Sequence, residues 1–553
     1  MVEVRKDAVE LKAASRDMSL FEVMPAGVAY PRNPDELSEL VRAVGAERKR
    51  GVQTSITARS AGTDMGGGPL NSGIIAVFTK YMNKMGDVAL DEERVLRQEP
   101  QDFVTAGFAV TQPGVYYRDF EKATLAKGLI LPSYPASREI CAMGGIVANN
   151  AAGERTLEYG KTEKYLEELA IVLSDGSQAT FKALSPEEVE MKKGQKNLEG
   201  EIYREMDALL TKNAKLIEAH RPKVSKNSAG YALWNIRDPR TGATNLAKLI
   251  CGSQGTLALW TRAKLRLVKP KEHRAMLVIF LQDLNLLPLI VERILPLGPE
   301  SFESYDDHTF TLAVKFLPEM LAEMGFAKAA RLGIDFIPEA EVVLAGGVPK
   351  MLLMAEFAEN SIEDADKKAA SAQSALADLH IKTKIEKNER ESEKFWIVRR
   401  ESFRLLRKNL HGLIAAPFID DFVVPPASYA QFLPELNALL AKYSDKFIYT
   451  IAGHVGNGNF HIIPLMDLGK PAVRRVILEL APLVYALVIK YGGTTTGEHN
   501  DGIIRTPYLP LLFGPEMIAL FAETKKIFDP LGIFNPGKKV GGTFADIERN
   551  MIR

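Results

Sequence analysis

Two short segments in the C-terminal part of the chain bring imidazole and carboxylate groups together. One is His454-Val-Gly-Asn-Gly-Asn-Phe-His461, and the other is Gly497-Glu498-His499. They contain three of the eight histidines in the chain. Divalent transition metals bind imidazole and carboxylate where no thiolate is offered. We therefore predict that His454, His461 and Glu498 bind one divalent metal (zinc, manganese or iron), with His499 beside them as a free base.

A β-hairpin is expected to position His454 and His461. Residues 446–451 and 460–463 have the composition of strands, and the glycines and asparagines between them suit a turn with positive φ. Glu498 follows a long helical segment and a Gly492-Gly493 break, so it arrives from another element. For any single histidine, a polar residue satisfied in a turn is the simpler explanation. The combined spacing favours the metal.

A small-residue loop near the N-terminus is suited to an anionic ligand. Residues 57–68 read Thr-Ala-Arg-Ser-Ala-Gly-Thr-Asp-Met-Gly-Gly-Gly. Such a backbone can lie flat against a ligand, and its N–H groups can form a nest for anionic oxygens. By itself the signal is weak, because most glycine-rich stretches are surface loops. The loop matches neither a strand–GxGxxG–helix turn nor a Walker loop.

Three further segments have a similar small-residue character. Residues 143–153 read Met-Gly-Gly-Ile-Val-Ala-Asn-Asn-Ala-Ala-Gly, residues 251–257 read Cys-Gly-Ser-Gln-Gly-Thr-Leu, and residues 535–538 read Asn-Pro-Gly-Lys. Each by itself could be an ordinary turn between secondary-structure elements.

Together, in order and content, these segments resemble the FAD-linked oxidases of the vanillyl-alcohol-oxidase and p-cresol-methylhydroxylase superfamily. The closer resemblance is to the D-2-hydroxyacid dehydrogenase branch, which includes D-lactate dehydrogenase, D-2-hydroxyglutarate dehydrogenase and the flavin subunit of glycolate oxidase. It extends from about residue 20 to about residue 542. It implies an α+β fold with a p-cresol-methylhydroxylase-type FAD-binding domain, an α+β substrate cap domain, and a C-terminal segment that returns to the flavin domain.

The resemblance also implies which residues contact FAD. The pyrophosphate would lie on Arg59, Ser60, Ala61, Gly62, Thr63, Asp64, Met65 and Gly66, and the rest of the cofactor along Pro132, Gly144, Gly145, Ala148, Asn150, Gly153, Gly255, Asn535 and Lys538. No histidine or cysteine in these loops is placed as a flavin tether, so we expect non-covalent FAD.

Two family motifs bear on the substrate. The metal motif of the family is His-x-Gly-Asp-Gly-Asn-x-His followed by Glu-His; here Asn457 replaces the aspartate, which is not a ligand in the family. The family also has Trp-x-x-Arg, with the arginine on the substrate carboxylate, and Trp396 and Arg399 match it. The planar guanidinium suits a carboxylate. Arg400 follows directly and is the alternative.

The function implied is oxidation of a D-2-hydroxy acid, such as D-lactate, to the 2-keto acid. FAD would accept the hydride, the metal would act as a Lewis acid on the substrate hydroxyl, Arg399 would hold the carboxylate, and His499 would take the proton. Ile419 and Ile463 lie where dicarboxylate-specific relatives would place basic or amide groups, which favours a monocarboxylate. The electrons would pass to a quinone, a cytochrome, an electron-transfer flavoprotein, oxygen or a separate subunit.

Two rival functions share the flavin scaffold. One is a non-redox transferase of the alkylglycerone-phosphate synthase type, which lacks the histidine motif. The other is a flavin-binding protein without catalysis. Reduction of the flavin by hydroxy acids would separate the dehydrogenase from both.

Composition limits the other classes of function. The chain has 553 residues, with 70 lysines and arginines against 70 acidic residues, so no net charge favours nucleic acid or an anionic membrane. Two cysteines suit a reducing compartment and cannot form a four-cysteine iron–sulfur cluster. We expect no signal peptide and no transmembrane segment, since charged residues interrupt the most apolar stretch, 464–491.

The chain length predicts two or three domains. A charged break at residues 269–274 is the main boundary. We expect an FAD-binding domain over 1–270, a substrate cap over 271–485, and a C-terminal segment over 486–553 that completes the active site. The expected location is the cytoplasm, either free or at the membrane periphery, and a homodimer is compatible with these features.

Overall fold

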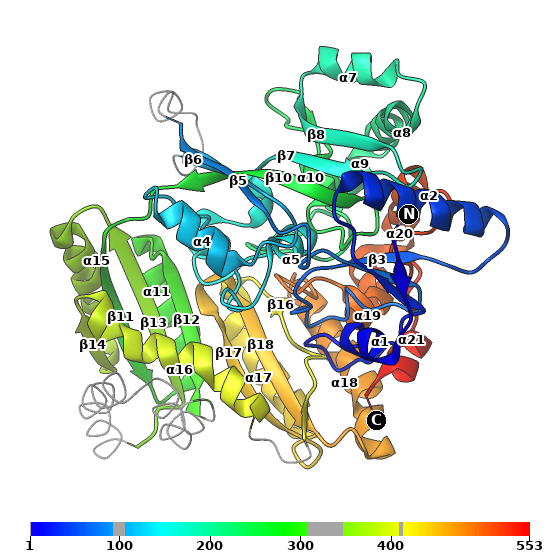
Figure 1. Cartoon of the computed structure of the whole chain (residues 1–553). Coiled ribbons are helices and arrows are strands. Elements are labelled where there is room, and N and C mark those ends of the chain that lie inside the picture. The colour runs from blue at the N-terminus through cyan, green and yellow to red at the C-terminus, as the bar shows by residue number, and fades with distance from the viewer. Residues whose placement is uncertain (1, 92–104, 308, 310–346, 409–412, 553) are drawn as a thin grey trace.

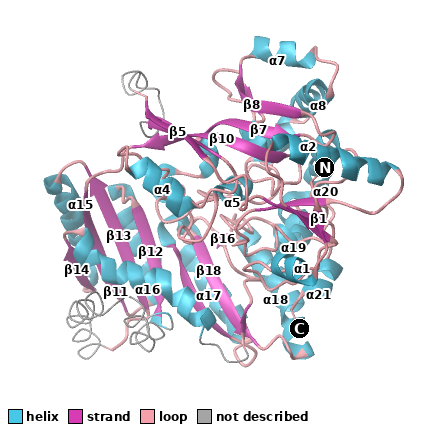
Figure 2. Ribbon diagram, viewed as in Figure 1, coloured by secondary structure: helices cyan, strands magenta, loops and turns pink. Residues whose placement is uncertain are grey.

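The computed structural model describes residues 2–91, 105–307, 309, 347–408 and 413–552. Three β-sheets organise these residues, two before residue 270 and one after it (Figure 1). Helices and long loops fill the space between the sheets (Figure 2). The fold is therefore α+β, as the sequence predicts.

The first sheet is small and mostly parallel. Its strand order is β1 (Val4–Arg5), β2 (Gly27–Ala29), β4 (Ile74–Val77) and β3 (Ile56–Arg59). Helix α2 (Pro34–Lys49) connects β2 to β3 and begins where the Asn33 side chain accepts a hydrogen bond from the Glu36 amide. Its apolar side packs on this sheet. The loop that follows β3 is the predicted flavin loop.

The second sheet is antiparallel and six-stranded. Its order is β5 (Met85–Leu90), β6 (Thr105–Thr111), β10 (Leu259–Val268), β7 (Leu166–Val172), β8 (Gln178–Leu184) and β9 (Thr244–Asn245). Helices α8 (Leu198–Lys212) and α20 (Leu509–Phe528) share its apolar core. Because α20 comes from the C-terminal part of the chain, that part returns to the flavin domain as expected.

The third sheet lies within residues 271–485, the region predicted to form the cap, and is antiparallel throughout. Its order is β14 (Lys382–Glu386), β11 (His273–Leu281), β13 (Met351–Glu359), β12 (Ser301–Asp306), β17 (Ile448–His454), β18 (Asn459–Met466) and β15 (Ile414–Ala415). The short β16 (Phe422–Val423) also pairs with β18. Alternate residues of β11 face opposite sides. Helices α11 (Leu287–Ile294) and α15 (Ile362–Ser374) cover one side, and α16 (Glu389–Lys408) covers the other.

The most apolar stretch of the sequence is divided between two elements. Residues 464–466 end strand β18, and helix α18 (Pro471–Lys490) begins after a turn. None of the helices in the described ranges is long and apolar enough to cross a bilayer. Helix α18 continues across the predicted boundary between residues 485 and 486. The three-part division of the chain remains our proposal.

Candidate active site

A cavity of about 790 Å³ lies between the flavin-domain loops and the cap sheet. The residues predicted to bind FAD that line it are Arg59, Ser60, Ala61, Gly62, Thr63, Asp64, Met65, Gly144, Gly145, Ala148 and Gly255. The same cavity is lined by Arg399, His461, Glu498 and His499. The structure thus brings both predicted motif sets to one cavity.

Six residues of the predicted FAD set do not line this cavity: Gly66, Pro132, Asn150, Gly153, Asn535 and Lys538. Two of them support the loops that do. The Asn535 side-chain amide donates to the carbonyls of Gly68 at 2.9 Å and Gln254 at 2.8 Å, and Lys538 donates to the Leu70 carbonyl. From the sequence, residues that face the cavity could therefore not be distinguished from residues that support its wall.

The cavity wall has polar atoms suited to FAD. Nη1 of Arg59 and Oγ of Ser253 are buried without a hydrogen-bond partner among the described residues. Buried donors of this kind need a partner, and a guanidinium suits a phosphate. At Gly144, a Cβ would overlap Ser60 Oγ, so only glycine lets helix α5 (Met143–Asn149) approach the loop this closely. The donor set and the shape of the wall fit a bound FAD.

The predicted hairpin is present. Strands β17 and β18 are joined by a turn at Val455–Asn457, and Gly458 has a φ of +74°. In the register, His461 lies opposite Ala452, and His454 lies opposite Asn459. The two histidines therefore project from the same face, and their ring centroids are 5.3 Å apart.

The predicted metal ligands lie close together. One ligand atom from each of His454, His461 and Glu498 lies within 4.8 Å of the others. Nδ1 of His454 lies 2.6 Å from the Glu303 carboxylate, and Nδ1 of His461 lies 3.0 Å from that of Asp420. Both Nε2 atoms are thereby directed away from these carboxylates, as in histidine ligands held by a carboxylate. This donor set fits a divalent transition metal.

A second set of side chains overlaps the first. Asp420, His461 and His499 also place ligand atoms within 4.8 Å of one another. Asp420 is fully buried and bridges the two imidazoles, with Oδ2 lying 2.6 Å from Nδ1 of His499. Burial would raise the pKa of Asp420, but the two histidines outweigh burial and hold it well below its usual range.

Nearby carboxylates keep His499 charged. Burial by itself would lower the pKa of His499, but Asp421 and Asp420 outweigh burial and raise it to about 9. Asp421 also accepts hydrogen bonds from the amides of Glu498 at 3.0 Å and His499 at 2.8 Å. The acidic pair thus fixes both the charge and the backbone of the Glu498-His499 segment.

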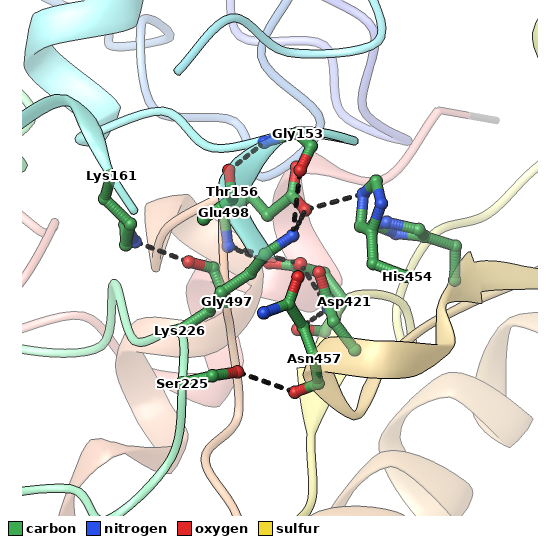
Figure 3. Close-up of polar contacts among 12 residues, drawn as sticks. Gly153, Thr156, Lys161, Ser225, Lys226, Asp421, His454, Asn457, Gly497 and Glu498 are labelled. Carbon is green, nitrogen blue, oxygen red and sulfur yellow. Dashed lines mark hydrogen bonds and ion pairs between the residues drawn. The ribbon is translucent and has the colours of Figure 1, made fainter. Parts of the chain in front are cut away.

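Two buried lysines reach this segment from the flavin domain (Figure 3). Nζ of Lys226 lies 2.8 Å from Oε1 of Glu498 and 3.3 Å from the Gly153 carbonyl. Nζ of Lys161 lies 2.5 Å from the Gly497 carbonyl. Oε1 of Glu498 also lies 2.8 Å from Nε2 of His454. The carboxylate therefore has two cationic or proton-donating neighbours before any metal is considered.

Arg399 lies beside the histidine cluster. Its Nε atom is 3.5 Å from Oε2 of Glu303, the carboxylate that also contacts His454. The side chain of Arg400 lies outside the described residues. Glu303 therefore joins the predicted carboxylate-binding arginine to a predicted metal ligand.

Sequence reasoning missed the residues that hold the site together. Glu303, Asp420, Asp421, Lys161 and Lys226 belong to no recognised motif, although all five are buried. The only local signal was at 420–421, where two adjacent acidic residues interrupt an apolar run. Paired carboxylates in such a run need buried partners.

Two family descriptions match this chain. "FAD binding domain" matches residues 25–182, and "FAD linked oxidases, C-terminal domain" matches residues 271–539. Among solved structures, p-cresol methylhydroxylase has a TM-score of 0.66 at 15% identity, covering 97% of this chain and 93% of its own. An alkyldihydroxyacetonephosphate synthase has a TM-score of 0.64 at 15% identity, covering 96% of this chain and 83% of its own. These structures show the fold alone.

Curated relatives are similar over most of this chain. D-2-hydroxyglutarate dehydrogenase of Pseudomonas putida is 26% identical over 97% of this chain and 50% of its own length. This chain thus spans about half the length of the D-2-hydroxyglutarate dehydrogenases it matches. The glycolate oxidase subunit GlcD of Bacillus subtilis is 27% identical over 94% of this chain and 89% of its own. D-lactate dehydrogenase of Archaeoglobus fulgidus is 25% identical over 93% and 91%. With both domain matches in chain order around one shared cavity, this chain belongs to the FAD-linked oxidases.

Proposed function

We propose that this chain oxidises a D-2-hydroxy acid to the corresponding 2-keto acid. The observation that carries the proposal is that Arg399 and His499 line the same cavity as the predicted FAD loops. A carboxylate-binding group and a proton acceptor beside a flavin are what this oxidation requires. The relatives named D-2-hydroxyglutarate dehydrogenase, glycolate oxidase subunit and D-lactate dehydrogenase support this class of substrate.

Each residue would have one role. Arg399 would bind the substrate carboxylate, and Glu303 would orient the guanidinium from its 3.5 Å contact. His499 would take the hydroxyl proton as the C–O double bond forms. When bound, FAD supplies the acceptor for the hydride that leaves the α-carbon.

We further propose that His454, His461 and Glu498 hold one divalent metal, which would supply Lewis acidity at the substrate hydroxyl. The carboxylate-held imidazoles support this set. A nearby cation would also lower the pKa of His499, which stands at about 9. Zinc, manganese and iron all suit two imidazoles and one carboxylate.

The substrate side chain is proposed to be small or apolar, as in D-lactate. Ala452 and Ile463 line the cavity, and Ile463 packs with Leu465 and Ala415 in a small apolar cluster. Ile419, the other position considered from the sequence, is buried in the cap core and does not line the cavity. Of the two, only Ile463 supports the choice of a monocarboxylate.

We propose that the electrons then leave to a quinone, a cytochrome, an electron-transfer flavoprotein or a separate subunit. Oxygen is the simplest acceptor to test, because it requires no partner. A homodimer and a cytoplasmic location, either free or at the membrane periphery, are also proposed.

Anaerobic flavin absorbance tests the function. D-lactate should bleach the oxidised flavin band, L-lactate should not, and D-2-hydroxyglutarate should bleach it less well. Dithionite serves as the control for a reducible flavin. If dithionite reduces the flavin and no hydroxy acid does, the dehydrogenase proposal is wrong and the transferase or binding-protein alternatives stand.

A further inference from the structure

The carboxylate of Asp64 closes one half of the glycine loop formed by residues 59–68. Its Oδ1 atom accepts hydrogen bonds from the backbone amides of Gly66 at 2.7 Å and Gly68 at 2.9 Å. Neighbouring amides in a glycine loop are the groups that would otherwise bind an anionic ligand oxygen. At this position, the anion is a side chain of the protein itself.

The second carboxylate oxygen connects the loop to distant parts of the chain. Oδ2 of Asp64 accepts a hydrogen bond from the Asn149 side-chain amide at 2.8 Å, at the end of helix α5. Oδ1 of Asn149 accepts one from Gln254 at 3.2 Å, and Oε1 of Gln254 accepts one from the Gly502 amide at 2.9 Å. Asp64 thus ties the loop to the segment that follows the predicted catalytic histidine.

The space around Gly68 shows how closely these groups pack. A Cβ at Gly68 would lie 2.6 Å from Nε2 of Gln254 and 3.1 Å from Oδ2 of Asp64. Both distances are too short for a side chain to fit without displacing these groups. Gly66 and Gly67 do not line the cavity, whereas Gly68 does, and the amides of Gly66 and Gly68 both point to the Asp64 carboxylate.

The first half of the loop faces the cavity without interruption. All five residues from 59 to 63 line it. Arg59 donates from Nη2 to the Arg16 carbonyl at 2.7 Å, while its buried Nη1 has no hydrogen-bond partner in the described part of the chain. A guanidinium with an open edge suits a phosphate, whereas a carboxylate repels one.

We propose that Asp64 is a positioning residue for FAD. It takes the anion position between the Gly66 and Gly68 amides and holds the loop in shape, while residues 59–63 bind the pyrophosphate with Arg59 as its charge partner. The proposed pyrophosphate site is therefore residues 59–63, shorter than the stretch from Arg59 to Gly66 expected from the sequence. The inference rests on membership of the FAD-linked oxidases and not on the proposed substrate.

Dissociation constants of FAD and riboflavin for the apoprotein test the proposal, with quenching of flavin fluorescence as the readout. Asp64→Ala should weaken FAD binding about tenfold or more, because two amides lose a charged acceptor. Asp64→Asn keeps an oxygen for both amides and removes the charge that opposes the pyrophosphate, and the Asn149 amide can turn so that its oxygen faces the new NH2 group. It should bind FAD at least as tightly as the unaltered protein, with riboflavin affinity unchanged because riboflavin has no phosphate.

Arg59→Met should weaken FAD binding and leave riboflavin binding unchanged. Asp87→Asn, which removes an exposed carboxylate from β5, is the matched control and should alter neither constant. If Asp64→Ala binds FAD more tightly than the unaltered protein, the 66–68 amides belong to the pyrophosphate and the proposal is overturned. If Asp64→Ala does not fold, Asp64→Asn decides: weaker FAD binding with unchanged riboflavin binding also overturns it.

Discussion

Nζ of Lys226 lies 2.8 Å from Oε1 of Glu498, and the lysine side chain has no exposed surface. The ammonium is the largest favourable influence on the Glu498 carboxylate: burial would raise the pKa of Glu498, but Lys226, followed by His454, lowers it well below its usual value. A buried pair of this kind is costly to break from one side only. The contact therefore gives a direct test of what Glu498 binds.

Lys226→Met should lower the free energy of unfolding of the metal-free protein by about 3–5 kcal/mol, because a buried carboxylate loses its partner. If Glu498 is a metal ligand, zinc or manganese should raise the melting temperature of this variant more than that of the unaltered protein. Lys223→Met removes an exposed lysine nearby and is the control. Equal thermal shifts in all three proteins would argue against Glu498 as a ligand.

The native protein should contain about one divalent transition metal per chain. His454→Ala should lose the metal, because an imidazole ligand is removed, whereas His499→Ala should keep the metal and lose turnover, because a general base is not a ligand. Elemental analysis of the two variants checks this. If both contain as much metal as the unaltered protein, the hairpin histidines are structural.

His499 should titrate at about 9 in the metal-free protein. Because this pKa is raised, the imidazole is charged at neutral pH and becomes a base only as the pH rises through about 9. Asp420→Asn removes a carboxylate 2.6 Å away and should move the pKa toward the ordinary histidine value of about 6.5. NMR of labelled histidine, assigned with His499→Gln, measures the shift. An unchanged pKa in Asp420→Asn would mean that Asp421 alone sustains it.

Gly62→Val should abolish FAD loading, whereas Arg399→Ala should leave it intact. Gly62 has a φ of +71°, and a Cβ there would overlap the Arg59 guanidinium. Valine is strained in this backbone conformation and would displace the proposed phosphate donor. The flavin-to-protein absorbance ratio measures loading. Normal hydroxy-acid turnover in Arg399→Ala would transfer the carboxylate-binding role to Arg400 or another residue.

Acid or heat denaturation should release yellow FAD into the supernatant. The two cysteines, Cys141 and Cys251, are both buried, and the histidines of the site contact carboxylates. Of the two cysteines only Cys141 lines the cavity, and burial raises the pKa of its thiol to about 12, so it is a poor nucleophile for a flavin tether. Colour that stays with the precipitated protein would contradict non-covalent binding.

The sequence alone determined the features that depend on neighbouring residues. The turn around Gly458 and the alternation of β17 and β18 place His454 and His461 on one face, because strand geometry repeats every two residues. The same holds for the glycine loop after β3, whose small residues permit close approach to a ligand. Local spacing was sufficient because each of these features lies within a few residues.

Only the tertiary structure decided how these features are held and charged. Glu303 is 151 residues from His454, and Lys226 is 272 residues from Glu498. No periodic pattern links such pairs; they meet because the cap sheet and the flavin-domain loops fold around one cavity. Their charges act over a few ångströms in a buried site, so the protonation of His499 depends on packing and not on sequence neighbours. Asp64 shows the same limit within a recognised motif: the loop composition predicted an anion-binding nest, and the fold filled half of it with the protein's own carboxylate.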